Sequence, residues 1–97
     1  MVDEPYDLVW TPEFSEDLFL AVDYIQNYLK MPVAARELYD DITGKLEKQR
    51  YTPTIAVARK GMRGQTFYCV SHGRYNAYYV IESRTIKVVG LKHQLQS

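Results

Sequence analysis

The chain has 97 residues, of which 46% are hydrophobic and 13% aromatic, enough for one hydrophobic core but too few for two. We therefore expect a single domain over residues 1–97. Cys69 is the only cysteine, which excludes an internal disulfide, and no apolar stretch approaches the roughly 20 residues that span a bilayer. Because the first residues also lack a signal-peptide pattern, we expect a cytoplasmic, reduced protein.

The net charge of zero conceals an asymmetry between the two halves of the chain. Residues 1–49 hold eleven acidic and four basic residues, a net charge of −7, whereas residues 50–97 hold eight basic residues and one acidic residue, a net charge of +7. Such a distribution indicates that the C-terminal half contacts phosphate or an acidic partner. The alternative is that the two halves attract each other across the fold.

The N-terminal half predicts a strand followed by a helix. Tyr6–Trp10 alternates polar and apolar residues of high β propensity, which predicts a short strand. Thr11 and Pro12 then indicate a helix start, because a threonine hydroxyl can cap the first turn and proline favours the first helical position. Apolar residues at spacings of three and four predict that this helix continues to about Lys30. They are Phe14, Leu18, Ala21, Val22, Ile25 and Leu29.

A second helix is predicted from Pro32, after a tight corner at Met31. Its apolar stripe has the same spacing as the first. The stripe consists of Ala35, Leu38, Ile42 and Leu46. Gly44 in its middle lowers the helix stability by about 1 kcal/mol relative to alanine, so this helix must depend on packing. The two helices together form a helical hairpin.

The C-terminal half predicts a sheet. Pro53 ends the second helix, and Thr54–Ala58 is compatible with a short extra strand. Three segments of period-two alternation follow, separated by turns at Gly73 and Ser83-Arg84, which predicts an antiparallel meander. These segments are Thr66–Ser71, Tyr75–Glu82 and Thr85–Leu91.

The predicted fold class is α+β with the order β-α-α-β-β-β. Packing the helical hairpin on one face of the small antiparallel sheet buries the apolar stripes of both, and the first strand pairs into the meander. The other face of the sheet then stays open.

Common enzyme signatures are missing, including glycine-rich phosphate loops, zinc-binding cysteine pairs and the H-E-x-x-H and G-x-S-x-G motifs. A small ribonuclease needs only a proton acceptor, a proton donor and cations around the phosphate. His93 suits proton transfer, although a structural histidine at a strand end is an equal alternative. Arg59, Arg63 and Arg74 suit phosphate binding, with a solvated basic surface as the alternative. For His72, in a hairpin turn, the structural role is favoured.

The tyrosines of the predicted meander offer a second candidate feature. Tyr75 and Tyr79 share one face of their strand, whereas Tyr78 takes the other. Stacking on nucleobases is the functional interpretation, but ordinary packing in the sheet is favoured.

The whole chain resembles the RelE/ParE toxin superfamily. The helical hairpin carries the first part of the resemblance, in Phe14-Ser-Glu-Asp-Leu18, Asp23-Tyr24-Ile25 with Tyr28-Leu29, Pro32-Val-Ala-Ala35, and Pro53 after it. The sheet carries the second part, in Gly73-Arg74-Tyr75 with Tyr78 and in Ile86–His93. The resemblance implies a toxin that a cognate antitoxin neutralises.

The superfamily has two classes of target. RelE-like members cut mRNA on the ribosome with basic residues of the open sheet face, whereas ParE-like members inhibit DNA gyrase and lack that basic set. This chain has Tyr68, Asn76 and Gln94 at positions that are usually basic in RelE-like members. Our first hypothesis is ribosome-dependent mRNA cleavage, with non-enzymatic gyrase inhibition second and a non-toxic interaction domain third.

For the nuclease, the resemblance assigns His93 as general acid or base. Arg63 and Arg74 would hold the phosphate, and Tyr75 or Tyr78 would position the base. Further RNA or phosphate contacts fall to Arg59, Lys60, Lys92 and Tyr78. No metal or cofactor is implied. The expected antitoxin covers the basic sheet side with an acidic, helical segment.

Overall fold

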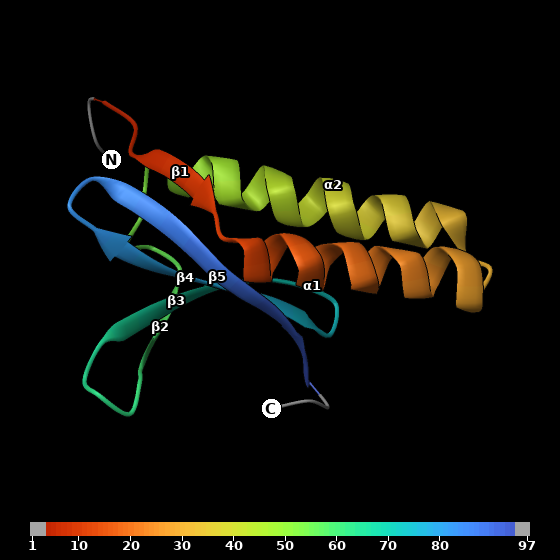
Figure 1. Cartoon of the computed structure of the whole chain (residues 1–97). Coiled ribbons are helices and arrows are strands. Elements are labelled where there is room, and N and C mark those ends of the chain that lie inside the picture. Colours follow the sequence, from red (N-terminus) through yellow and green to blue (C-terminus); the bar gives the residue numbers. More distant parts are fainter. Residues whose placement is uncertain (1–3, 95–97) are drawn as a thin grey trace.

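The computed structural model describes residues 4–94 and contains a helical hairpin on one side of a five-stranded sheet (Figure 1). The elements are β1 (Asp7–Trp10), α1 (Pro12–Asp23), η1 (Tyr24–Tyr28), α2 (Pro32–Gln49), β2 (Val57–Lys60), β3 (Thr66–His72), β4 (Tyr75–Glu82) and β5 (Thr85–His93). The strand order is β1-β5-β4-β3-β2. β1 is parallel to β5, and the other neighbours are antiparallel. The predicted α+β architecture is confirmed, but the sheet is mixed rather than antiparallel as predicted, because β1 pairs in parallel with β5.

Thr11 starts α1 and ties it to the sheet. Its hydroxyl oxygen accepts a hydrogen bond from the Phe14 backbone N–H at 3.2 Å, and the same hydroxyl donates to the Val88 carbonyl at 2.7 Å. Pro12 occupies the first helical position, as predicted. Because the Thr11 side chain is buried, these two bonds are shielded from water. The helix start is therefore attached directly to β5.

The first helix ends differently from the prediction. Regular α-helix stops at Asp23, and Tyr24–Tyr28 continues as a π-helical turn in which the Leu29 N–H bonds to the Tyr24 carbonyl at 3.0 Å. The chain then reverses at Lys30, which has a left-handed φ of 60°. Over five residues, a π-helix and an α-helix direct nearly the same side chains toward the core. The spacing of apolar residues in the sequence therefore does not distinguish the two kinds of helix.

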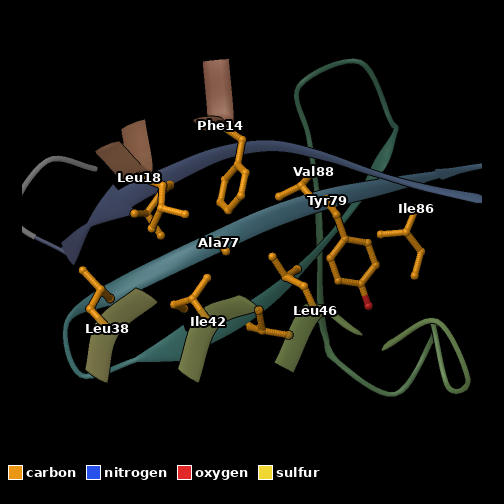
Figure 2. Packing of buried hydrophobic residues seen from close by; sticks show 11 residues of the cluster. Phe14, Leu18, Leu38, Ile42, Leu46, Ala77, Tyr79, Ile86 and Val88 are labelled. Atoms are coloured by element: carbon orange, nitrogen blue, oxygen red, sulfur yellow. The ribbon is translucent and has the colours of Figure 1, made fainter. Parts of the chain in front are cut away.

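The hydrophobic core lies between the hairpin and the helix-facing side of the sheet. Figure 2 shows Phe14 and Leu18 of α1 and the row Leu38, Ile42 and Leu46 of α2 packed toward the strands. The strand side of this core consists of Val70, Ala77, Tyr79, Ile86, Val88 and Leu91. The predicted apolar stripes thus form or border the observed core, except for Leu29, which is exposed.

Tyr79 fixes the end of α2 against the middle of the sheet. Its ring is fully buried and stacks on Tyr68 with centroids 5.4 Å apart. Its hydroxyl donates toward the Pro53 carbonyl at 2.6 Å and lies 3.1 Å from the Gln49 side-chain oxygen. Burial raises the pKa of the Tyr79 phenol, which therefore stays a hydrogen-bond donor.

The extra strand lies later in the chain than predicted. We expected it at Thr54–Ala58, but β2 comprises Val57–Lys60 and pairs with β3. Residues 51–56 form turns instead. Hydrogen bonding to β3 determines the bounds of β2, since all four of its residues are exposed and carry no burial pattern. The meander therefore has four strands.

A β-bulge at Val89 changes the side-chain alternation of β5. Tyr79 pairs with Val88 and Tyr78 pairs with Gly90, so Val89 is an extra residue between the two pairs. Ile86 and Val88 face the helices before the bulge. After it, Leu91 faces the helices opposite Ala77, and His93 does so opposite Tyr75. Strict alternation would have placed both on the other face.

A polar cluster connects α2 with the end of β3. The Asp41 carboxylate lies 2.9 Å from both the Lys45 ammonium and the His72 ring nitrogen Nδ1, and Lys45 also donates to the Ser71 carbonyl. The hydrogen bond from Lys45, followed by that from His72, lowers the pKa of the Asp41 carboxyl. These contacts agree with the structural role predicted for His72.

Thr11→Val should destabilise the fold. Valine has a similar shape but leaves the Phe14 N–H without its side-chain acceptor, and the Val88 carbonyl keeps only its bond from the Thr11 backbone N–H at 3.0 Å. We therefore expect a loss of about 1–2 kcal/mol in the free energy of unfolding. Thr11→Ser is the matched control, because it keeps both hydrogen bonds. Urea denaturation monitored by circular dichroism measures both variants. Equal stability of Thr11→Val and the wild type would contradict the role of the cap.

Asp41→Asn should reduce stability in a pH-dependent manner. Because the folded-state pKa of Asp41 lies below its unfolded value of about 3.9, its stabilisation is complete above that value and is lost as pH falls through the folded pKa. We expect the variant to be less stable than the wild type at pH 6, by about 1 kcal/mol or less because the group is partly exposed, and the difference to shrink toward about pH 2.

Asp40→Asn is the control for this experiment, since the neighbouring Asp40 is exposed and makes none of the cluster's contacts. Urea denaturation at several pH values measures all three proteins. A difference between Asp41→Asn and the wild type that stays constant with pH would refute the electrostatic role of the cluster.

Candidate functional site

The face of the sheet opposite the helices carries a shallow hollow with a volume of about 360 Å³. Four strands contribute to it, and no helix does. We call it the sheet hollow, and it is lined by Arg59, Phe67, Tyr78, Val89, Gly90 and Lys92. A ligand can therefore enter the sheet hollow directly from solvent.

The strand register explains why these residues meet. Arg59 of β2 is paired with Phe67 of β3, and Tyr78 of β4 is paired with Gly90 of β5. A Cβ added at Gly90 would lie 3.5 Å from the Asp17 carboxylate and 4.0 Å from the Lys92 side chain. Alternation after Val88 places Val89 on this face, and the bulge brings Lys92 to the same face. The hollow thus depends on the irregularity in β5.

The sheet hollow combines an apolar base with two cations. Phe67, Tyr78 and Val89 are partly buried, whereas Arg59 and Lys92 are exposed. Such a surface suits a ligand that presents an apolar or aromatic group beside negative charge. Three predicted binding residues, Arg59, Tyr78 and Lys92, therefore come together. The sequence analysis did not select Phe67 or Val89 as site residues. Period-two alternation places Phe67 on the opposite face of its strand from Tyr68 and could have identified it, whereas no sequence pattern indicated the bulge.

Lys60, the fourth predicted binding residue, lies apart from the other three. It is next to Arg59 on β2 and pairs with Thr66, so its side chain takes the opposite face of the strand. The structure does not bring it into the sheet hollow.

His93 lies on the helix-facing side of the sheet. Its ring meets the Tyr75 ring edge to face, with centroids 5.0 Å apart. Burial, and secondarily the nearby Tyr24 phenol, raises the pKa of the Tyr75 phenol. Both rings line a groove of about 760 Å³ between the distal half of the hairpin and the ends of β4 and β5. We call this the hairpin groove; Leu20, Tyr24, Leu29 and Met31 also line it.

The predicted catalytic residues form two separate groups. Arg74 precedes Tyr75 in the β3–β4 turn, and its carbonyl accepts from the Gln94 N–H at 2.7 Å, so the Arg74 backbone lies near the His93 end of β5. Arg63 lies in the β2–β3 turn at the other end of β3. At about 3.3 Å per strand residue, β3 separates the two turns by about 20 Å. The rings of His93 and Tyr75 come together, only the backbone of Arg74 is placed near them, and Arg63 does not join them.

Two searches of the described residues concern other kinds of site. Within residues 4–94, no three His, Cys, Asp or Glu side chains are arranged to hold a metal ion. None of the helices in that range has both the length and the apolar character needed to cross a membrane.

Comparison with known proteins gives one family. The chain matches the model of the family described as ParE toxin of type II toxin-antitoxin system, parDE, over residues 8–97. It is similar to a structure of the chromosomal ParDE toxin-antitoxin system from P. aeruginosa, with a TM-score of 0.74, 16% identity and coverage of 91% of this chain and 95% of that one.

The chain is also similar to a structure of the toxin-antitoxin complex RelBE2 from Mycobacterium tuberculosis, with a TM-score of 0.61, 17% identity and coverage of 95% of this chain and 94% of that one. A search of curated proteins found no significant match. At these identities, the two solved structures establish the shared fold.

The family match covers nearly the whole chain, and the observed element order and one-sided packing agree with it. Both similar structures come from toxin-antitoxin systems. The resemblance seen in the sequence is thereby confirmed. The chain belongs to the RelE/ParE superfamily, as a member of the ParE toxin family of type II toxin-antitoxin systems.

Proposed function

We propose that this toxin inhibits DNA gyrase by binding it through the sheet hollow, without catalysing a reaction. The observation that carries the proposal is the separation of the groups that RNA cleavage needs. His93 faces the helices, whereas Arg59 and Lys92 face the open side of the sheet, and Arg63 lies at the far end of β3. Acid-base catalysis needs these groups within hydrogen-bond reach of one phosphate.

The composition of the sheet hollow supports a protein target. Aromatic residues and arginine are enriched at the energetically important centres of protein interfaces, and Phe67, Tyr78 and Arg59 provide them here. Lys92 adds a second positive charge that can meet a carboxylate of the target. Membership of the ParE family supports gyrase as the target, because ParE-like members of the superfamily act on that enzyme.

Ribosome-dependent mRNA cleavage, the first hypothesis from the sequence, becomes the second candidate. The meeting of Arg59, Tyr78 and Lys92 favours it, since two cations and a tyrosine could hold a phosphate and stack on a base. In this case Lys92 or Tyr78, rather than His93, would have to transfer the proton. This function predicts mRNA fragments in a cell-free translation reaction and normal gyrase activity.

Lys92→Glu should weaken gyrase inhibition. The substitution reverses an exposed charge at the sheet hollow, so we expect the toxin concentration for half-maximal inhibition to rise at least about tenfold. The assay is supercoiling of relaxed plasmid by purified gyrase and ATP, analysed on agarose gels. Lys87→Glu is the matched control, because Lys87 is an exposed lysine of the same strand that does not line the hollow.

The variant His93→Ala tests, in the same supercoiling assay, whether inhibition of gyrase needs His93. The proposal expects it to inhibit gyrase as the wild type does, because His93 lies on the other face of the sheet. Normal supercoiling in the presence of wild-type toxin would overturn the proposal, and mRNA cleavage would then favour the second candidate. Unchanged growth on expression without antitoxin would favour an interaction domain that has lost toxicity.

A further inference from the structure

β3 and β4 separate at the end of the sheet that carries the β2–β3 turn. Their pairing ends at Tyr68 opposite Tyr79, although β3 begins at Thr66 and β4 continues to Glu82. Figure 1 shows the β2–β3 hairpin bending away from the β4–β5 hairpin at this end. A cleft of about 670 Å³ lies between the two, and we call it the strand cleft. Its walls include Arg63, Gln65, Thr66, Phe67, Ile81 and Glu82.

The strand cleft leaves backbone hydrogen-bonding groups of both strands unpaired. In a β-hairpin with a two-residue turn, the closing pair is hydrogen-bonded, and so is every second pair after it. The closing pair of β3 and β4 is His72 with Tyr75. By this count Thr66 and Ile81 should be bonded to each other, but within residues 4–94 the pairing stops one such pair earlier. Both residues therefore direct an N–H and a C=O into the cleft.

The facing strand edges favour a peptide as the ligand. Unpaired edges of this kind are a template for an added strand. Each edge offers a donor together with an acceptor, which an extended peptide matches with its own N–H and C=O groups. The phosphates of a nucleic acid accept hydrogen bonds but donate none, so they would leave the C=O groups of Thr66 and Ile81 unpaired.

The β2–β3 turn holds Arg63 at one wall of the strand cleft. The Gly61 N–H donates to the Gln65 carbonyl at 2.7 Å, and the Arg63 N–H donates to the Gln65 side-chain oxygen at 3.2 Å. The Phe67 ring packs against Gly61, where an added Cβ would lie only 2.6 Å from the ring. Because these contacts order the turn before a ligand arrives, less conformational entropy is lost when the Arg63 guanidinium binds a carboxylate.

The charges of the two walls specify the ligand further. The β2–β3 hairpin carries three exposed bases, Arg59, Lys60 and Arg63, and no acidic residue. Glu82 is on the opposite wall, at the end of β4. A peptide segment with an acidic side chain toward the β2–β3 hairpin and a basic or polar side chain toward β4 complements both walls.

We propose that the strand cleft binds an extended segment of the target protein. The segment pairs with the backbone of Ile81 and places a carboxylate at Arg63. This proposal rests on the proposed function, in which gyrase is the target, and it adds a second contact region to the sheet hollow. The two regions are continuous, because Phe67 lines both.

Arg63→Glu should weaken gyrase inhibition. The substitution replaces the cation that meets the carboxylate by a repelling charge, so we expect the toxin concentration for half-maximal inhibition in the supercoiling assay to rise at least about tenfold. Arg36→Glu is the matched control, since it makes the same change at an exposed arginine of α2 that lines neither the strand cleft nor the sheet hollow. We expect the control to inhibit within about twofold of the wild type. Circular dichroism confirms that both variants fold.

Hydrogen exchange tests the backbone pairing without any substitution. Exchange of the toxin's amides is measured by mass spectrometry, with the toxin alone and bound to purified gyrase. We expect gyrase to slow exchange at Thr66 and Ile81, whose N–H groups face the cleft, and to leave the β3–β4 turn at Gly73-Arg74 unchanged. Unchanged exchange at Thr66 and Ile81 in the bound toxin would overturn the proposal.

Three further outcomes distinguish the cleft from the target. If wild-type toxin inhibits gyrase and Arg63→Glu inhibits equally well, the cleft proposal falls, and the sheet hollow remains as the proposed gyrase contact. If wild-type toxin neither inhibits nor binds gyrase, both proposals fall. Slower exchange at Ile81 with single-stranded RNA, but not with gyrase, would overturn the peptide proposal and favour the second candidate function.

Discussion

The bulge at Val89 is the constraint on which the sheet hollow and the order of side chains at the end of β5 depend. One extra residue in β5 reverses the faces of all that follow, so Leu91 completes the core and Lys92 reaches the open side. Without it, Lys92 would point into the helices, and the sheet hollow would lose a cation. Bulges commonly redirect side chains next to binding sites, and this one determines that Lys92, rather than His93, faces the open side of the sheet.

One-sided packing then gives the molecule its two kinds of surface. Only part of the hairpin packs on the helix-facing side of the sheet, because the far end of the hairpin projects beyond the strands (Figure 1). The open side exposes aromatic rings and cations, whereas the uncovered underside of the hairpin exposes mainly aliphatic side chains and tyrosine. These differences in chemistry suit different partners, which a small toxin needs if it is to bind both a target and an antitoxin.

The charge asymmetry of the sequence persists in the folded protein. Within residues 4–94, Arg50 forms an ion pair with Glu47 across the two halves, and the His72 ring nitrogen lies 2.9 Å from the Asp41 carboxylate. Arg59, Arg74 and Lys92 of the basic half are nevertheless exposed. Because many of the basic side chains are exposed to solvent, the charge asymmetry does not serve mainly to hold the two halves of the chain together. They remain available to a negatively charged partner.

The sequence alone was sufficient for the fold class and the core. Helical spacing identified Phe14, Leu18, Leu38, Ile42 and Leu46, because burial of one helical face imposes a strict period on the apolar residues. The cap at Thr11 was equally readable, since it depends on a local hydrogen bond to the first turn.

The candidate site was decided by tertiary structure. Alternation along β5 does not reveal a bulge, and so the face of His93 was fixed only by pairing with β4. The distance between Arg63 and Arg74 likewise follows from the length of β3, which separates two turns that are close in sequence. Local patterns determine what each segment becomes, but register and packing determine which side chains meet, because these depend on contacts between distant segments.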